Sequence, residues 1–300
     1  MNRPCTILAA LFLPLAHAGS ADVPPASTVA TVSAPQARPV RIQVPSAVMK
    51  RAIPAAVALP NGYAESTAAY PVVYLLHGAG DNEMGWYSRT PVQEMADTHG
   101  VIVVSPSVGL SWYFDSPEDK DSRYETFTAV ELVKYMDANF RTIPKREARA
   151  LAGNSMGGHG AMFLAIRHKD VFSAAAPMSG GMDIRASHPQ VGPFPSQWGI
   201  SRHLGTIQAH PDRWNELTVI NQVDSLKNGE LTIALDCGTG DFFLEANRQL
   251  HLKLTGMGIA HSYAEHPGQH NWDYWKLALP RQMAILDRHF KQALAATRQP

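Results

Sequence analysis

Cysteine is scarce in this sequence, which has only Cys5 and Cys237 among its 300 residues. Cys5 falls in an N-terminal segment that we expect to be removed, so Cys237 would be alone in the mature chain. A single cysteine excludes an intrachain disulfide and a cysteine-based metal site. Cys237 follows an apolar run, and we expect it to be a small buried residue rather than a nucleophile.

The sequence also lacks an excess of charge, since 26 Lys and Arg balance 26 Asp and Glu. A nucleic-acid binder would need a basic excess or a basic stripe, so we expect no nucleic-acid partner. No spacing of His, Asp or Glu indicates a metal site, and no Gly-rich loop indicates a dinucleotide. We therefore expect no metal and no cofactor.

The N-terminus has the pattern of a cleavable signal peptide over residues 1–18. Arg3 supplies a positive start, an apolar run covers 6–15, and Ala16-His17-Ala18 has the form of a cleavage site. The run is far short of the ~20 residues that span a bilayer, so we expect no stable membrane insertion. This pattern predicts a secreted or periplasmic protein cleaved after Ala18. Residues 19–39, rich in Ala, Pro and Ser, are interpreted as a flexible leader.

From residue 40 to 300 the pattern indicates one α/β domain with a mostly parallel sheet and helices on both faces. Short apolar runs alternate with longer amphipathic stretches such as 126–139. The expected strands are 72–76, 101–105, 149–152, 174–178, 231–235 and 261–264. Residues 181–227 contain no clear strand and carry Trp198 and Trp214. We interpret them as a cap-like insertion that could cover a site.

The strongest chemical signal is Gly153-Asn154-Ser155-Met156-Gly157, a Gly-x-Ser-x-Gly sequence. The apolar run 149–152 precedes it and a helical stretch, 157–166, follows. A nucleophile elbow needs this arrangement, because the serine lies at a strained strand-to-helix turn where flanking glycines let the backbone come close. Ser155 is therefore the candidate nucleophile.

A serine nucleophile needs a base and an acid, which should follow it in the order acid then histidine. Asp236 and Asp241 both follow the strand 231–235, and we favour Asp241 because it lies within the glycine-containing loop. His266 and His270 both follow the last strand. His270, just before a helix, is favoured.

Two further features bear on the expected site. His159, on the helix behind the nucleophile, is expected to pack rather than react. The oxyanion hole should combine the Met156 amide with an amide of the loop 77–80.

Four motifs together resemble the esterase D-type family of α/β-hydrolases. They are Leu75-Leu76-His77-Gly78, the elbow 153–158, Cys237-Gly238-Thr239-Gly240-Asp241-Phe242 and Pro267-Gly268-Gln269-His270-Asn271-Trp272. The resemblance implies the triad Ser155, Asp241 and His270, with Ala79 as the second oxyanion amide. It also implies the α/β-hydrolase fold and serine esterase activity. Asn154 stands where His is frequent in the family, which bears on specificity rather than on the chemistry.

We expect a carboxylesterase acting on short-acyl or phenolic-acyl esters, with a small-molecule or carbohydrate ester as substrate. Trp86, Trp112 and Tyr113 are candidate substrate-binding residues, because their loops are expected near the triad, whereas Trp275 is expected in the core. Three alternatives remain. They are a secreted acyltransferase of the mycolyltransferase kind, an S-formylglutathione hydrolase, and a non-catalytic binding protein on the same scaffold. The sequence does not indicate the oligomeric state.

Overall fold

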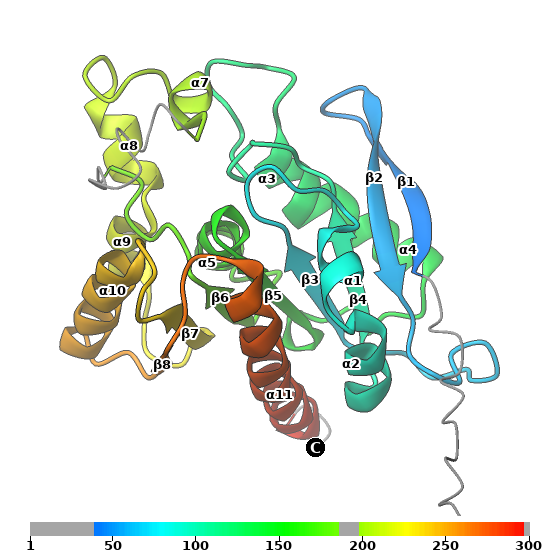
Figure 1. Cartoon of the computed structure of the whole chain (residues 1–300). Coiled ribbons are helices and arrows are strands. Elements are labelled where there is room, and N and C mark those ends of the chain that lie inside the picture. The colour runs from blue at the N-terminus through cyan, green and yellow to red at the C-terminus, as the bar shows by residue number, and fades with distance from the viewer. Residues whose placement is uncertain (1–38, 186–197, 297–300) are drawn as a thin grey trace, which may run out of the picture. The chain divides into compact units, whose positions relative to one another are not determined.

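Eight strands form one sheet in the order β1-β2-β4-β3-β5-β6-β7-β8 (Figure 1). Strand β1 pairs with β2 and β2 with β4 in antiparallel fashion, whereas all the remaining pairs are parallel. The strands are β1 (Val40–Ser46), β2 (Arg51–Ala58), β3 (Val72–Leu76), β4 (Ile102–Pro106), β5 (Arg149–Asn154), β6 (Ala174–Met178), β7 (Thr232–Gly238) and β8 (Ser262–His266). The expectation of a mostly parallel sheet is confirmed.

This computed structural model describes residues 39–185 and 198–296. The expected signal peptide, 1–18, lies outside the described residues. So do all but the last residue of the expected leader, 19–39, and residues 186–197 of the insertion. The described residues all fall within one unit that spans 37–300.

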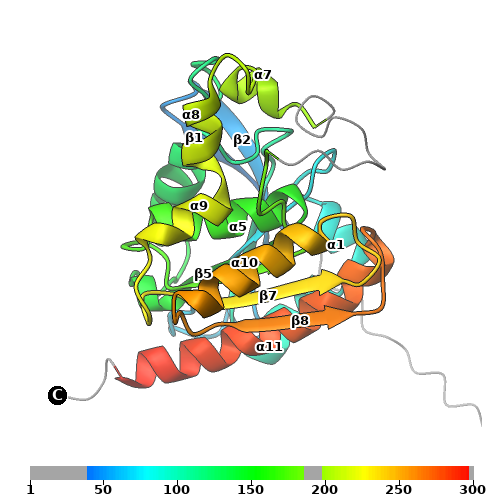
Figure 2. The same ribbon diagram turned by 90° about the vertical axis from the view of Figure 1, so that its left-hand side faces the viewer.

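Helices cover both faces of the sheet because alternate residues of each strand point to opposite sides. In β3, Val72, Tyr74 and Leu76 join one core cluster, and Val73 and Leu75 join the other. The helices of the second cluster are α1 (Gly85–Arg89), α2 (Val92–His99) and α11 (Trp272–Ala296). The first cluster includes α4 (Leu132–Asn139), α5 (Met156–Arg167) and α10 (Leu244–Gly256). Figure 2 shows α10 and α11 on opposite sides of β7 and β8.

The six expected strands are all present and differ from the expectation only at their ends. The expected helix 126–139 is longer, because α3 (Tyr124–Thr126), a π-helical turn (Phe127–Glu131) and α4 follow one another without a break. Strands β1 and β2 were not expected. The first half of β1 alternates Val40 and Ile42 with Arg41 and Gln43 and is largely exposed, and β2 is rich in Ala with Pro54 inside it, so neither has the continuous apolar run of a central strand.

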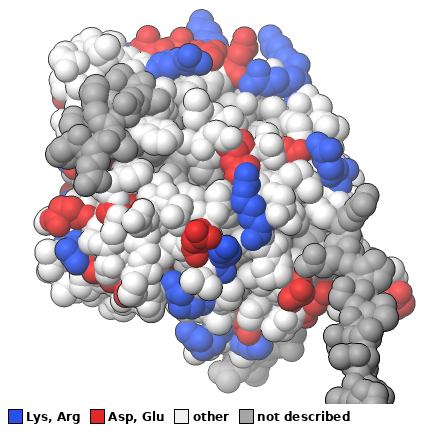
Figure 3. All heavy atoms as spheres, viewed as in Figure 1, with Lys and Arg blue, Asp and Glu red and all other residues white. Residues whose placement is uncertain are grey.

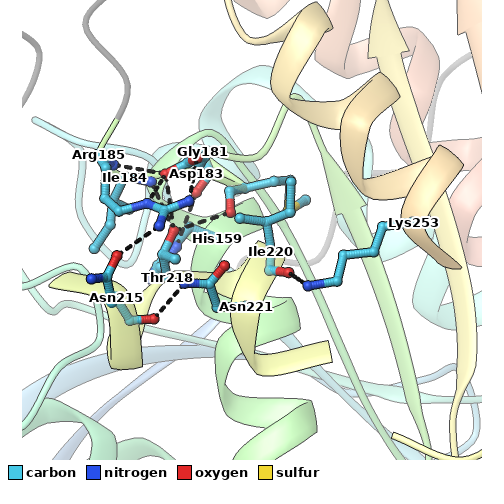
Figure 4. A network of polar contacts seen from close by, with 11 residues as sticks. His159, Gly181, Asp183, Ile184, Arg185, Asn215, Thr218, Ile220, Asn221 and Lys253 are labelled. Carbon is cyan, nitrogen blue, oxygen red and sulfur yellow. Dashed lines mark hydrogen bonds and ion pairs between the residues drawn. The ribbon is translucent and has the colours of Figure 1, made fainter. Parts of the chain in front are cut away.

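The described part of the insertion contains the short helices α7 (Ile200–Leu204), α8 (Pro211–Leu217) and α9 (Val219–Gln222), followed by a 3-10 turn (Val223–Ser225). A polar network links the segment 181–185, which follows β6, to α8 and α9 of the insertion, and it includes His159 of α5 and Lys253 of α10 (Figure 4). The Asp183 carboxylate accepts two hydrogen bonds of 2.8 Å from the guanidinium of Arg185, which also donates to Asn215 at 2.7 Å. These Arg185 bonds hold the pKa of Asp183 below its usual range, although burial alone would raise it.

The middle of the insertion, at Trp198 and His203, is bonded to the loop that contains Leu110 and Trp112. The indole N–H of Trp112 donates to the carbonyl oxygen of Trp198 at 2.9 Å, and a ring nitrogen of His203 lies 3.0 Å from the carbonyl oxygen of Leu110. Trp214 is fully buried and donates to the carbonyl oxygen of Gly205. The described part of the insertion is therefore bonded to the body through Trp198 and His203.

Acidic and basic side chains are interspersed on the face shown in Figure 3, without a large area of one sign. Several are paired, as Arg89 is with Asp81 at 2.8 Å. None of the helices in the described part of the chain combines the length and the apolar character that a bilayer span requires.

Candidate active site

Ser155, His270 and Asp241 are joined by hydrogen bonds at the carboxyl ends of β5, β8 and β7. The Nε2 atom of His270 lies 2.8 Å from Ser155 Oγ, and its Nδ1 atom lies 2.9 Å from each carboxylate oxygen of Asp241. A carboxylate can only accept, so Nδ1 carries the proton and Nε2 is left to accept the serine proton. The Asp241 side chain has no exposed surface and that of His270 is 10% exposed.

Ser155 has the strained backbone of a nucleophile elbow, with φ +56° and ψ −118°. Its N–H donates to the carbonyl oxygen of Met178 at the end of β6, and its own carbonyl accepts from His159 N–H, both at 2.9 Å. A Cβ on Gly157 would overlap the carbonyl oxygen of Leu76, and one on Gly153 would lie 2.6 Å from that atom. Glycine is therefore required on both sides of the serine.

The structure also places the residues that competed for the acid, base and nucleophile roles. Asp236 bonds to Tyr274 and Arg281 instead of a histidine. His266 ends β8 and accepts at its carbonyl from Thr239 N–H at 2.8 Å. Cys237 is buried, and burial raises the pKa of its thiol well above the usual value, so it is no thiolate nucleophile.

The loop that follows β3 lies against the nucleophile. A Cβ on Gly78 would be 3.3 Å from Ser155 Cβ. His77 is buried, accepts the Val108 N–H at Nε2 (3.0 Å), and therefore donates from Nδ1 to the carbonyl oxygen of Gly78 (2.8 Å). Burial lowers the pKa of His77, which keeps this ring neutral.

The His77 bond fixes the peptide unit that carries the Ala79 N–H. In a trans peptide the C=O and the N–H point in opposite directions, so holding the Gly78 oxygen aims the Ala79 N–H away from His77. That N–H donates to no acceptor within the described chain. Met156 is the first residue of α5, where an amide has no acceptor within the helix. Two backbone donors beside Ser155 can thus serve an oxyanion.

Three aromatic rings surround the His270 imidazole. The Phe242 ring lies 4.0 Å from it, centre to centre, and Phe243 and Trp275 contact it edge-on at 5.2 and 5.0 Å. Trp275 is buried as expected, and its N–H donates to Ser179 Oγ at 3.1 Å. The packing of Phe242 and Phe243 on the His270 ring was not predicted. Their position directly after Asp241 was a signal that could have indicated it.

The expected substrate contacts of Trp86, Trp112 and Tyr113 need correction. Their exposed fractions are 0%, 1% and 0%, so their side chains offer no surface to a ligand in this structure. The Trp86 N–H donates to the Leu76 carbonyl at 3.0 Å, and the Tyr113 hydroxyl donates to the His77 carbonyl at 3.1 Å. These rings support the oxyanion loop and the insertion from within the core.

His159 packs, as expected, behind the nucleophile. It is fully buried between the rings of Trp112, Phe114 and Phe163. Its Nδ1 atom lies 3.1 Å from the carbonyl oxygen of Gly181, at the start of the insertion. Burial lowers the pKa of His159 to about 4.

The arrangement can carry out nucleophilic acyl transfer, because it joins an activated hydroxyl, an oriented base and two free amides. Among residues 39–185 and 198–296, no group of three or more His, Cys, Asp or Glu could hold a metal ion.

The family model described as "Putative esterase" matches residues 46–286. An esterase of Mycobacterium tuberculosis is 28% identical over 235 residues, which cover 71% of this chain. The alignment covers 51% of that relative, so this chain spans about half the relative's length.

Two further matches cover a larger share of the other protein. The acetyl esterase of Caldicellulosiruptor saccharolyticus is 28% identical over 208 residues, covering 68% of this chain and 78% of the relative. The solved structure of a ferulic acid esterase superposes with a TM-score of 0.72 at 28% identity. That match covers 84% of this chain and 98% of the other.

Proposed function

The chain belongs to the esterase family, and we propose that it is a serine carboxylesterase working through an acyl-enzyme. The observation that supports this best is the hydrogen-bonded line from Asp241 through His270 to Ser155. A family member that had become a binding module would not need to keep the strained Ser155 backbone and the base aligned with it.

In the proposed reaction Ser155 Oγ attacks the ester carbonyl while His270 Nε2 takes the hydroxyl proton. Asp241 keeps the imidazole in the required tautomer and stabilises the imidazolium that forms. The Ala79 and Met156 amides donate to the oxyanion. His270 then gives its proton to the leaving alcohol, and the Ser155 ester remains. Water attacks that ester with His270 again as the base, which releases the carboxylic acid and restores the serine.

The proposed substrates are short-acyl or phenolic-acyl esters of small molecules or carbohydrates. The relatives named an acetyl esterase and a ferulic acid esterase support this choice. Each methylene of a longer acyl chain gains ~0.8 kcal/mol on burial only where there is room for it.

A rate profile over acetyl, butyryl, octanoyl, palmitoyl and feruloyl esters tests this proposal. We expect kcat/KM to be highest for acetyl, butyryl or feruloyl esters and to fall toward palmitoyl. A steady rise from butyryl to palmitoyl would contradict the proposed substrate class. Complete absence of hydrolysis, together with no labelling of Ser155 by a fluorophosphonate, would contradict the esterase function itself.

The choice between water and an alcohol as acyl acceptor separates hydrolysis from transfer. We propose hydrolysis as the main reaction. Adding a sugar or glycerol to the assay should leave the yield of free acid nearly unchanged. Conversion of most of the acyl group into a new ester would favour the acyltransferase alternative.

Export remains a proposal that the pattern of residues 1–18 supports. Expression of the whole chain in a bacterial host, followed by fractionation, is the direct test. We expect a protein in the periplasm or medium that begins at Gly19. Full-length chain retained in the cytoplasm would contradict export.

A further inference from the structure

Asp236 is a buried carboxylate beside the active site that the triad does not use. It lies in β7, and its side chain is 2% exposed. The Tyr274 hydroxyl donates to one of its oxygens, and the Arg281 guanidinium lies 3.0–3.2 Å from both. Tyr274 and Arg281 are seven residues apart on α11, so they share one face of that helix. The carboxylate thus fastens the first turns of α11 to the end of β7.

Those turns hold the loop that carries His270. The Asn271 side chain accepts the Tyr274 N–H at 3.1 Å, and the Asn271 carbonyl lies 3.2 Å from the N–H groups of Tyr274 and Trp275. The residue after the catalytic base is therefore bonded directly to the first turn of α11. Any shift of that turn would move His270 with it.

The Tyr274 ring also closes the loop from its other side. Gly268 has φ +155°, and a Cβ there would overlap this ring. The Gly268 carbonyl accepts the Gly240 N–H at 2.7 Å, next to Asp241. The His270 loop therefore lies between the acid loop on one side and Tyr274 on the other.

Apolar contacts alone would hold the body of α11, where Ala278, Leu279, Met283, Leu286 and Phe290 are buried. A buried charge that is bonded to two partners seldom adds stability over a packed apolar group, whereas it does fix geometry through directed bonds. The bonds from Asp236 hold the part of α11 that adjoins the His270 loop, where the position of the helix affects the base, rather than the part farther along the helix. Burial, together with the bond to Asp236, raises the pKa of Tyr274, which keeps its hydroxyl protonated as the donor.

We propose that Asp236 is a positioning residue, which sets the distance from His270 to Ser155 and Asp241 by way of Tyr274 and Arg281. It touches neither substrate nor reacting atoms. The proposal rests on the proposed esterase function, since positioning has an effect on turnover only where the triad reacts.

The test compares Asp236→Asn and Tyr274→Phe with a matched ion-pair variant, Glu265→Gln. Tyr274→Phe removes only a hydroxyl and keeps the ring against Gly268, so it is the variant expected to disturb folding least. Glu265 accepts two hydrogen bonds of 2.7 Å from Arg248 on α10 and has no bond to the His270 loop. Its loss controls for breaking a carboxylate–arginine pair near β7.

For a short p-nitrophenyl ester, we expect Asp236→Asn and Tyr274→Phe each to lower kcat about 10- to 100-fold. KM should change less than about two-fold, because binding of the ester does not use the imidazole. The double variant should lose little more than the worse single variant, since both act through one connection. Glu265→Gln should keep kcat within about two-fold of the parent.

A proton NMR spectrum supplies a readout that does not depend on turnover. The low-field resonance of the His270–Asp241 hydrogen bond should broaden or shift in both positioning variants and stay unchanged in Glu265→Gln. Unchanged kcat and resonance in Tyr274→Phe and Asp236→Asn, with only a lower unfolding midpoint, would overturn the proposal. Failure of the proposed esterase function can be told apart from failure of the positioning role. In the first case the parent enzyme itself would be inactive, and the resonance could still be compared between the parent and the variants.

Discussion

The Nδ1 atom of His77 lies 2.8 Å from the carbonyl oxygen of Gly78, and this contact orients the peptide that bears the Ala79 N–H. Replacing His77 with Ala removes the contact. We expect kcat to fall about 100-fold, the loss typical of one oxyanion donor, while KM changes little. Affinity for a boronic acid analogue of the tetrahedral intermediate should fall with kcat.

His289→Ala is the matched control for that variant. His289 is a half-buried histidine whose two ring nitrogens lie 2.7 Å from Ser173 Oγ and 2.9 Å from Thr232 Oγ1, at the opposite ends of β6 and β7 from the site. Its loss should lower stability and leave kcat unchanged. Equal losses of kcat in both variants would show that His77 acts only on folding.

Ser155→Ala should lower kcat by about 10⁴-fold or more, because the triad acts as a unit. Asp241→Asn should approach the same loss, since an amide in that place favours the wrong imidazole tautomer. Steady-state hydrolysis of a p-nitrophenyl ester measures both. The control is Ser225→Ala on the exposed turn after α9, whose hydroxyl bonds only to the Gln222 carbonyl. Substantial activity in Ser155→Ala would refute the mechanism.

The triad could be predicted from the sequence because each member has a local signal. Ser155 lies between glycines that the close backbone requires, and Asp241 and His270 lie in loops after late strands. The roles of Trp86 and Trp112 could not be predicted in this way. A loop position does not reveal whether a ring faces solvent or core, which depends on contacts with distant residues such as Leu76 and Trp198.

Long-range pairing also explains the other differences. Strand β1 pairs with β2, and β2 with β4, at one side of the sheet, and neither has the continuous apolar run by which the central strands were predicted. Asp236 was expected to be a structural carboxylate bonded to loop backbone, but its partners are the side chains of Tyr274 and Arg281, far along the chain on α11. No local pattern could have identified them.

His159 should make stability depend on pH in the acid range. Its pKa is about 4 in the folded protein, against an ordinary value near 6.5, so between these values the unfolded chain binds more protons. Stability is therefore fully present above pH ~6.5 and is lost as the pH falls toward 4, by roughly 3 kcal/mol from this residue. Burial also lowers the pKa of His77, His203 and His289, which adds to the loss in the same direction.

Urea unfolding of the parent and of His159→Gln at pH 7.5, 6 and 5 measures this effect. Glutamine can still donate to the Gly181 carbonyl but does not titrate. We expect the variant to be less stable at pH 7.5 because of imperfect packing, and to lose less stability than the parent on acidification. Parallel losses in the two proteins would show that His159 does not titrate in this range.

Two glycines in helices should respond in opposite ways to replacement by alanine. A Cβ on Gly160, in α5, would overlap the buried ring of Tyr113, whereas Gly256, at the end of α10, has no atom within 4 Å of such a Cβ. Gly160→Ala should cost about 1–3 kcal/mol through overpacking. Gly256→Ala should gain about 0.4–1 kcal/mol, because alanine loses less backbone entropy on folding.

Urea midpoints of the two variants measure these changes, and activity separates their causes. Tyr113 donates to the His77 carbonyl, so a shift of its ring in Gly160→Ala should also disturb the oxyanion loop. We expect kcat to fall in Gly160→Ala and to stay unchanged in Gly256→Ala. If Gly160→Ala were as stable and as active as the parent, Tyr113 would have room to move. The contact of its ring with α5 would then not be what holds the loop at His77 in place.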